Sequence, residues 1–340
     1  MTSRGERPRT GILGTGSYLP KEEVGNAEIA ALTGADEEWI ESRTEIRSRR
    51  FAAPDEATSD LAAKAGAEAL ARAGLTADDI DHLIVATSTG DSPQPPTSSL
   101  VQDLLGASRA ACLDVNVVCS GFVYALVLAH GLMSLRPGTR ALVIGADVYS
   151  RILDFEDRRT AVLFGDGAGA AVLGPVAAPY GLIDFTLAGH GDQHRLIRVE
   201  AGGSRAPASH ETVDAGGHYF RMDGRAVRDF AMREVPPALT ALAVRSGVRL
   251  DEVHHFVPHQ ANGVMLRRLT DLLGIPHDRT HRTLERYGNV GSASVPVALD
   301  SAYRSGALRS GDLVLLAGFG GGMALGAAML RWGAGAAWHR

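Results

Sequence analysis

Cys119 has the sequence surroundings of a catalytic nucleophile. It lies in the run Leu-Asp-Val-Asn-Val-Val-Cys-Ser-Gly-Phe-Val-Tyr-Ala-Leu (residues 113–126), which reads as a buried strand leading into a helix, with the cysteine at the junction. Free backbone N–H groups and the positive end of the helix dipole at such a junction favour the thiolate, the nucleophilic form of cysteine. A lone cysteine is more often a small buried hydrophobe. Partners elsewhere in the chain therefore have to decide between the two interpretations.

An internal repeat supplies those partners. Between residues 72 and 145, matching residues recur at a constant offset and without a gap, so that Gly74 recurs as Gly247 (247 − 74 = 173) and Asn116 recurs as Asn289. Each half is therefore expected to hold a helix, a strand, a strand-to-helix turn, a helix and a strand. A period this long with only two copies predicts a duplicated half-domain.

The same register aligns residues that could do chemistry. Cys119 coincides with Ser292, which lies three residues after Asn289, and His259 follows an apolar strand over residues 253–257 that matches a strand of the first half. If the halves pack about a pseudo-twofold axis, equivalent strand ends converge on one cleft. Cys119, His259 and Asn289 would then meet there from three corresponding corners.

Six motifs in this order and spacing extend from about residue 11 to residue 331. They are Glu38-Trp-Ile with Arg43-Thr, Asp114-Val-Asn-Val-Val-Cys-Ser-Gly-Phe, Phe164-Gly-Asp-Gly-Ala-Gly-Ala-Ala-Val, Pro258-His-Gln-Ala-Asn, Gly288-Asn with Ser292-Ala-Ser, and Gly318-Phe-Gly-Gly-Gly. With them the chain resembles the β-ketoacyl-acyl-carrier-protein synthase III family, condensing enzymes of the thiolase superfamily. The resemblance implies an α/β thiolase fold, in which duplicated halves, here residues 10–177 and 178–340, form a five-layer αβαβα sandwich.

The resemblance also implies a mechanism. Cys119 takes the acyl group from a short acyl-CoA, and the backbone N–H groups of Cys119 and Gly321 hold the tetrahedral oxyanion. A malonyl group on acyl carrier protein then loses carbon dioxide, while His259 and Asn289 donate hydrogen bonds to its thioester oxygen. The carbon nucleophile formed in this way attacks the acyl-cysteine and gives a β-ketoacyl thioester that begins a fatty acid or polyketide chain. A homodimer is expected, and no cofactor is required besides the coenzyme A thioester, which is a substrate.

Further residues are implied to bind the coenzyme A arm. Trp39 and Arg158 would sandwich the adenine ring, Arg43 would meet the phosphates, and Asn262 would hydrogen-bond pantetheine, because stacking and a planar guanidinium suit these tasks. Phe319 is expected at the inner end of the substrate channel. As alternatives, Trp39 could simply anchor a helix face and Arg158 could be a solvated charge.

Several positions depart from the family pattern. Val117 and Val118 add β-branched bulk before the nucleophile, Glu45 replaces a glycine, and Val264 replaces a common basic residue.

The departures continue along the substrate channel. Arg228 stands where an aromatic residue usually lines the channel, and Asp229 stands where a cation usually docks the carrier protein. Gln94 occupies the region that reaches across the dimer in relatives and caps the acyl pocket. These changes put a housekeeping role in doubt and favour secondary metabolism.

Two neighbouring reaction classes can be weighed against condensation. A degradative thiolase would carry a second cysteine in the C-terminal glycine turn, and residues 318–322 contain none. A degenerate, inactive subunit would have lost Cys119, His259 or Asn289. An acyltransferase that passes the acyl group to an oxygen, nitrogen or other carbon nucleophile in natural-product assembly remains open as the second interpretation.

The composition favours a soluble cytoplasmic protein. The chain has 340 residues, of which 45% are hydrophobic and 21% charged, enough for a large core. No apolar run is expected to be long enough to span a membrane, and the polar first residues lack a signal-peptide apolar region. The net charge of −5 without long basic blocks argues against nucleic acid as a partner. With two cysteines no disulfide scaffold is expected, which fits a reducing compartment.

Three motifs suggest other sites, and we interpret each as structural. The glycine-rich residues 165–169 lead into a strand and lack the lysine and the helix start of a phosphate loop, and residues 14–16 lack the third glycine of a dinucleotide loop. His254 and His255 are neighbours on a strand and therefore point to opposite faces. No metal site is expected.

Overall fold

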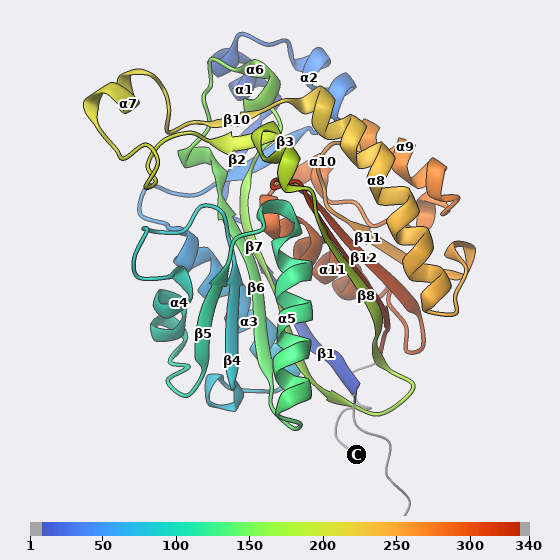
Figure 1. Cartoon of the computed structure of the whole chain (residues 1–340). Helices are drawn as coiled ribbons and strands as arrows, with labels where there is room; N and C mark the ends of the chain where they lie inside the picture. Colours follow the sequence, from blue (N-terminus) through green and yellow to red (C-terminus); the bar gives the residue numbers. More distant parts are fainter. Residues whose placement is uncertain (1–8, 334–340) are drawn as a thin grey trace, which may run out of the picture.

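The computed structural model describes residues 9–333, which form two main sheets with helices packed on them (Figure 1). The first sheet has five strands in the order β1-β7-β6-β4-β5, and the second has four in the order β11-β12-β13-β8. The bounds of the first sheet are β1 (Arg9–Tyr18), β4 (His82–Ala86), β5 (Ala111–Val115), β6 (Ala141–Val148) and β7 (Asp166–Val176). Those of the second are β8 (Gly181–Gly189), β11 (His255–Pro258), β12 (Leu313–Gly320) and β13 (Ala324–Arg331). Two small ribbons pair β2 (Glu22–Gly25) with β3 (Ser48–Phe51), and β9 (Ile197–Val199) with β10 (Phe220–Met222).

The two main sheets repeat one topology. β4 and β6 are parallel while β6 and β7 are antiparallel, and in the second sheet β11 and β12 are parallel while β12 and β13 are antiparallel. In the first sheet β5 pairs in parallel with β4, and at the corresponding edge of the second sheet β11 has a parallel bridge between Phe256 and Thr280. The duplication predicted from the sequence is therefore present in the strand order. The boundary between the halves at residues 177 and 178 stays a prediction.

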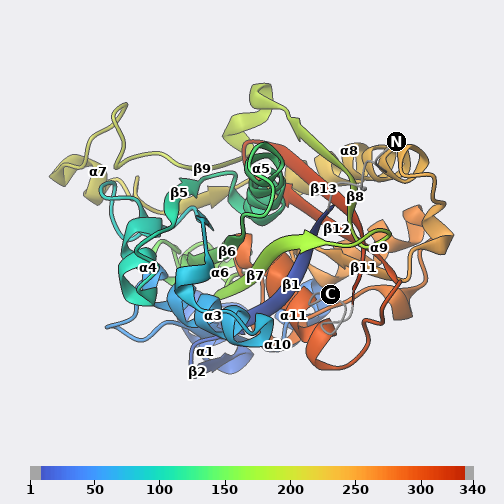
Figure 2. The ribbon, with the colours of Figure 1, turned by 90° about the horizontal axis from the view of Figure 1, so that it is seen from below.

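Helices complete the five layers (Figure 2). α3 (Thr58–Ala73) and α4 (Thr97–Leu105) pack on the first sheet, α5 (Gly121–Leu135) and α11 (Ser294–Arg304) contact strands of both sheets, and α8 (Gly224–Arg245) packs on the second sheet with α9 (Gly263–Leu273) beside it. This is the predicted αβαβα order. The shorter helices are α1 (Asn26–Thr33), α2 (Glu37–Thr44), α6 (Arg158–Ala161), α7 (His210–Asp214) and α10 (Leu284–Tyr287).

Burial on both faces explains the apolar central strands. Every residue of β6 and β12 is buried, because each sheet is covered on both sides by helices. Between the sheets, Phe122 and Leu126 of α5 pack in one cluster with Leu299 of α11 and Leu316 of β12. Each such buried side chain contributes roughly 1.5–3 kcal/mol relative to an exposed one.

Two glycines let the halves interlock. A Cβ on Gly145 in β6 would lie 2.4 Å from the carbonyl oxygen of Ser292, and a Cβ on Gly318 in β12 would lie 2.9 Å from the Cα of Ser120. These glycines are equivalent in the repeat, so each central strand admits a turn from the opposite half. The turns that carry Cys119 and Ser292 are held together at the N-terminal ends of the central helices α5 and α11.

One segment corrects the expectation that no apolar run is long enough to span a membrane. Val118–Leu135 has the length and a hydropathy of 1.8 that would allow a membrane span, and 56% of it is buried inside the protein. It consists mainly of α5, which lies between the two sheets. The long apolar run therefore matches a core helix.

The two glycine-rich motifs contribute to strands, whereas the sequence predicted only that residues 165–169 lead into one. Residues 166–169 begin β7, and residues 14–16 lie in β1, where they pair with β7. A Cβ on Gly169 would lie 2.7 Å from the backbone nitrogen of Val297. Close packing of α11 on the strand therefore explains this glycine.

Candidate active site

Cys119 lies at the strand-to-helix junction expected from the sequence. It is part of the 3₁₀ turn η2 (Val118–Ser120), which leads into α5, and it is 5% exposed. Burial and the nearby carboxylate of Asp147 raise the pKa of the Cys119 thiol, while its own backbone N–H acts in the opposite direction. A helix terminus contributes about 0.3–1 kcal/mol at exposed sites, whereas full burial shifts a pKa by up to about 3–5 units. Burial therefore dominates, and the free protein holds a thiol where the sequence favoured a thiolate.

The residue before the nucleophile has a strained backbone. Val118 has φ of +45°, in the left-handed region that β-branched residues avoid. Such a conformation costs about 1–3 kcal/mol and persists only where the surrounding structure imposes it. The valine that departs from the family pattern thus lies at a tightly constrained turn.

His259 follows β11 and is held as a neutral imidazole. Its backbone N–H donates to Ala317 at 2.7 Å, and its ring meets the ring of Phe319 edge-on, with centroids 5.5 Å apart. The side chain is 2% exposed, and burial lowers the pKa of His259 to about 3. A neutral ring carries one N–H donor, which is enough for the donor role predicted for His259. Phe319, predicted at the inner end of the channel, is buried against this ring.

Asn289 is held with its amide nitrogen free to donate. Its backbone N–H donates to Leu163 at 2.8 Å, and its carbonyl accepts from Gly165 at 3.0 Å. Its side-chain Oδ1 accepts from the backbone N–H of Gly291 at 3.0 Å. Because the oxygen is used in this way, the NH₂ group can donate to a substrate oxygen.

The glycine turn after β12 packs directly on the nucleophile turn. A Cβ on Gly321 would lie 2.8 Å from Cγ2 of Val118, so the residue predicted for the oxyanion hole is next to Cys119 in space. A Cβ on Gly320 would lie only 3.0 Å from the Cys119 sulfur. Sequence reasoning missed Gly320, although the run of three glycines was the available signal.

Trp39 and Arg158, which are predicted to sandwich adenine, lie beside each other. The Arg158 guanidinium lies 5.7 Å from the centre of the Trp39 ring, which is a cation–π contact between α2 and α6. A ring inserted between two stacking partners needs about 7 Å, two van der Waals separations. Adenine binding between them would therefore require the pair to separate slightly.

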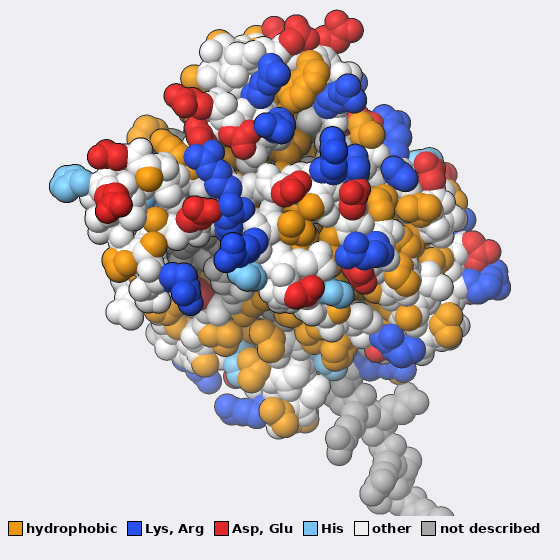
Figure 3. Space-filling view, turned by 45° about the horizontal axis from the view of Figure 1, so that its top comes forward, with side chains coloured by type: hydrophobic (Ala, Val, Ile, Leu, Met, Phe, Trp, Pro, Cys, Tyr) orange, Lys and Arg blue, Asp and Glu red, His pale blue; other side chains and the backbone are white. Residues whose placement is uncertain are grey.

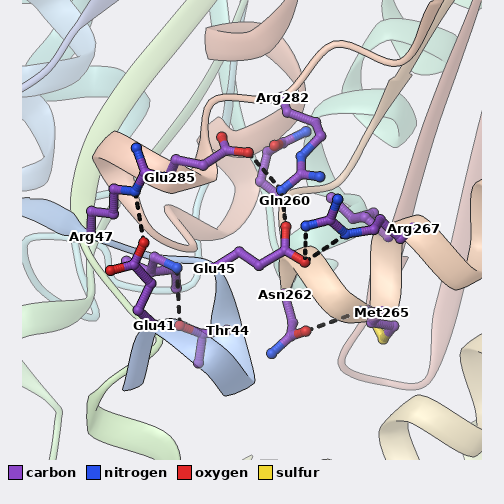
Figure 4. Close-up of polar contacts among 12 residues, drawn as sticks. Glu41, Thr44, Glu45, Arg47, Gln260, Asn262, Met265, Arg267, Arg282 and Glu285 are labelled. Atoms are coloured by element: carbon purple, nitrogen blue, oxygen red, sulfur yellow. Dashed lines mark hydrogen bonds and ion pairs between the residues drawn. The ribbon is translucent and has the colours of Figure 1, made fainter. Parts of the chain in front are cut away.

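Asn262 links the two segments predicted to bind coenzyme A. Its Oδ1 caps α9 by accepting from the backbone N–H of Met265 at 3.0 Å (Figure 4). Its Nδ2 donates to the carbonyl of Arg43 at 2.9 Å. One N–H of the amide remains for a ligand. Arg43, whose guanidinium is predicted to meet the phosphates, is an exposed residue in the last turn of α2.

Glu45, which replaces the family glycine, forms an ionic cluster beside Asn262 (Figure 4). Its carboxylate accepts hydrogen bonds from Arg267 and from Arg282. Burial acts to raise the pKa of Glu45, but the two arginines outweigh it and lower the pKa. A Cβ on Gly263 would lie 2.6 Å from Oε2 of Glu45, so the first residue of α9 has to be small. Glu45 therefore pairs with Arg267 of α9 and with Arg282, which also pairs with Glu285.

The remaining predicted residues are on the surface. The Arg228 guanidinium lies 2.8 Å from the carboxylate of Asp229, and the two side chains are 48% and 57% exposed. Gln94 lies on the exposed loop after β4, where Ser92 donates to its carbonyl at 2.9 Å. Val264, at the start of α9, is 47% exposed. The structure thus places none of these side chains against Cys119 within one chain.

Sequence reasoning also missed Asp147, a buried acid at the end of β6. It is fully buried and accepts hydrogen bonds from Ser88 and Ser292. An acidic residue in an otherwise apolar strand was the signal, because unpaired carboxylates are rarely buried.

Comparison with known proteins identifies the family. A sequence model for 3-oxoacyl-[acyl-carrier-protein (ACP)] synthase III matches residues 113–191, and a model for the C terminal of the same family matches residues 244–332. Acetoacetyl CoA synthase NphT7 of Streptomyces sp. (strain CL190) is 52% identical, over 94% of this chain and 98% of that protein. Beta-ketoacyl-[acyl-carrier-protein] synthase III of Caldanaerobacter subterraneus subsp. tengcongensis is 41% identical, over 96% of this chain and 99% of that protein.

Solved structures agree with this assignment. The 3-oxoacyl-[acyl-carrier-protein] synthase III of Aquifex aeolicus VF5 superposes with a TM-score of 0.88 at 35% identity, covering 95% of this chain and 100% of that one. The priming β-ketosynthase of the R1128 polyketide biosynthetic pathway gives a TM-score of 0.89 at 35% identity, covering 96% and 97%. From the fold, the motifs and these similarities, the chain belongs to the 3-oxoacyl-[acyl-carrier-protein] synthase III family of acyl-transferring condensing enzymes.

Proposed function

We propose that this enzyme transfers a short acyl group from coenzyme A to Cys119 and condenses it with a malonyl thioester. In the first step the thiol loses its proton, its sulfur attacks the thioester carbon, and coenzyme A leaves as the thiol. The backbone N–H groups of Cys119 and Gly321 are the proposed donors to the oxyanion. The close packing of Gly320 and Gly321 on the nucleophile turn supports this assignment.

In the second step the malonyl carboxylate leaves as carbon dioxide, and its bonding electrons form an enolate on the thioester. The enolate carbon then attacks the acyl-cysteine, which releases the sulfur as a thiolate. His259 and Asn289 are the proposed donors to the enolate oxygen, where hydrogen bonds stabilise the negative charge that develops. Two observations support this assignment most directly. Burial keeps the His259 ring neutral, and the backbone N–H of Gly291 donates to the side-chain oxygen of Asn289, which leaves the amide NH₂ group for the substrate. The proposed reaction uses no metal or cofactor, and its coenzyme A thioester substrates support a cytoplasmic location.

The carrier of the malonyl group has two candidates. The family name points to malonyl-acyl carrier protein, whereas the name of the 52% identical relative describes the synthesis of a coenzyme A thioester. Two features of the surface favour malonyl-CoA here. Arg228 is paired with Asp229, and Arg267 is paired with Glu45, so two cations on α8 and α9 are neutralised by neighbours. In Figure 3 a narrow band of Lys and Arg side chains crosses this end of the molecule, with Asp and Glu side chains beside it.

Asp229→Lys is expected to raise kcat/KM for malonyl-acyl carrier protein by about threefold to tenfold and to leave kcat/KM for malonyl-CoA within about twofold. The physical reason is that an acidic carrier meets attraction in place of repulsion, so the gain should shrink in high salt. Glu234→Lys is the matched control, because Glu234 forms a similar ion pair with Arg233 on the same helix. A wild-type enzyme that prefers malonyl-acyl carrier protein would contradict the choice of malonyl-CoA.

We also propose a homodimer in which Gln94 reaches the acyl pocket of the partner subunit. Sedimentation is expected to give about twice the chain mass of 35.8 kDa. Gln94→Phe should shift the preference among acyl-CoA donors, measured as kcat/KM for acetyl-CoA against longer acyl-CoAs. The exposure of this loop in the single chain supports the proposal. A fully active monomer would contradict it.

A further inference from the structure

The pseudo-twofold repeat creates a second, altered copy of the nucleophile turn. The turns η2 and η7 (Gly291–Ala293) begin at equivalent positions (291 − 118 = 173), so Ser292 stands where Cys119 stands in the other half. The same offset pairs Asp147 with Gly320, at the ends of β6 and β12. The surroundings of Ser292 can therefore be compared directly with those of the nucleophile.

In the turn that carries Ser292, a carboxylate lies where the turn that carries Cys119 would hold the reaction oxyanion. The backbone N–H of Ser292 donates to Oδ2 of Asp147 at 2.7 Å. Its counterpart is the backbone N–H of Cys119, a proposed donor to the reaction oxyanion. In the first copy the counterpart of Asp147 is Gly320, where a Cβ would lie 3.0 Å from the Cys119 sulfur. A side chain there would fill the space beside the thiol, whereas Asp147 fills the equivalent space beside Ser292.

Asp147 is a buried carboxyl group: burial raises its pKa, and the hydrogen bonds that it accepts from Ser88, Ser292 and Thr89 act in the opposite direction. It is fully buried, and its Oδ1 accepts from the backbone N–H of Ser88 at 2.8 Å, from the Ser88 hydroxyl at 3.0 Å and from the Thr89 hydroxyl at 2.9 Å. No Lys or Arg within residues 9–333 forms an ion pair with it. A buried carboxylate without a cation is retained only where several donors stabilise it. This one joins the loop after β4 to the turn η7.

The carboxylate also determines where Asn289 points. Successive backbone N–H groups of one turn bind the two side chains, since Gly291 donates to Oδ1 of Asn289 and Ser292 donates to Asp147. Gly291 has φ of +56°, and a Cβ on it would lie 2.3 Å from Oδ2 of Asp147. The turn is thus packed directly on the carboxylate. Any shift of the turn would rotate the amide of Asn289.

We propose that Asp147 occupies the pseudo-symmetric counterpart of the oxyanion hole and thereby aims the Asn289 amide at the malonyl thioester. Asp147 is a positioning residue, since it acts through the turn and not on the substrate. The inference rests on the proposed role of Asn289 in malonyl decarboxylation. It adds a reason why the duplicated turn is retained in the half without the nucleophile.

Asp147→Asn tests this inference, because it keeps the shape but places an NH₂ group against donors of Ser88 or Ser292. Carbon dioxide release from malonyl-CoA is expected to fall in kcat by about 10-fold to 100-fold, with KM within about threefold. Acylation of Cys119 by acetyl-CoA, followed by intact-protein mass, should not fall, because loss of the Asp147 charge removes one of the two causes that raise the pKa of the Cys119 thiol. Ser88→Ala is the matched control, since it removes one hydrogen bond to the opposite oxygen of Asp147 and leaves Ser292 in place. It should change decarboxylation by less than about threefold.

Two results for Asp147→Asn would contradict the positioning role of Asp147. Equal losses in acylation and decarboxylation would mean a general structural role, and unchanged decarboxylation would remove the role altogether; either overturns the inference. If Asp147→Asn does not fold, Gly291→Ala displaces the same turn with the carboxylate in place, and it should show the same split between the half-reactions. A wild-type enzyme that releases no carbon dioxide from malonyl thioesters would overturn the proposed function itself, and the inference would fall with it.

Discussion

Cys119→Ala is expected to abolish acyl-enzyme formation while leaving the fold intact. The side chain is buried at the start of α5, and alanine removes only the sulfur from a position where a small residue fits. No other group in the proposed mechanism can form the thioester, so the loss should be complete within detection. The measurement is the intact-protein mass after incubation with acetyl-CoA, with the melting temperature as the check on folding.

Cys112→Ala provides the matched control for this experiment. Cys112 is the second cysteine of the described chain, half-buried in β5, with its sulfur 3.6 Å from the Ser99 hydroxyl. Its replacement should leave acylation unchanged, because its contacts are structural. A Cys119→Ala protein that still gains the mass of an acetyl group would disprove the assignment of the nucleophile.

His259→Ala and Asn289→Ala are each expected to slow malonyl decarboxylation by about 10²–10³-fold, the usual effect of losing one oxyanion donor. Self-acylation of Cys119 should change far less, since both residues are assigned to the second half-reaction. The measurement compares carbon dioxide release with the rate of acyl-enzyme formation for each variant.

Asn116→Ala is the matched control, because Asn116 is the repeat counterpart of Asn289 and is exposed. The pH dependence offers a further check on His259. Its pKa of about 3 means that the ring is already neutral from pH 5 to 8, and protonation would occur only as the pH falls toward 3. Decarboxylation should therefore show no titration of His259 in that range. Full decarboxylation in both variants would favour transfer of the acyl group to another kind of acceptor.

The sequence alone was sufficient to predict two duplicated halves, and its resemblance to the family implied the layered fold. The constant offset between Gly74 and Gly247, and between Asn116 and Asn289, is a local pattern that survives without knowledge of any contact. Strand and helix periods then set the order of elements in each half. The turns η2 and η7 fall at equivalent positions of the repeat, as this register requires.

The sequence also identified the candidate residues that lie in recognisable motifs. Cys119 follows β5 and His259 follows β11, whereas Asn289 follows the short helix α10. Their predicted roles stay predictions until the variants above are measured. Motif reasoning can name such candidates because the residues that carry each motif are neighbours along the chain.

The tertiary structure alone decided the electrostatics of the site. Whether Cys119 is a thiol or a thiolate depends on how deeply it is buried and on the carboxylate of Asp147, and neither is written in the residues next to it. The same holds for Glu45, whose partner Arg267 is 222 positions away along the chain. Charges act through space, so their balance is set only once the chain has folded.

Asp147 shows most clearly what could not be predicted from the sequence alone. Its donor Ser292 is 145 positions away, and in the sequence it is a single acid at the end of an apolar strand. Packing brings it against the turn that holds Asn289, and burial makes its hydrogen bonds strong enough to fix that turn. The repeat determined which residues are equivalent in the two halves. Only the folded structure determined that one copy of the turn binds a carboxylate of its own while the other presents a thiol.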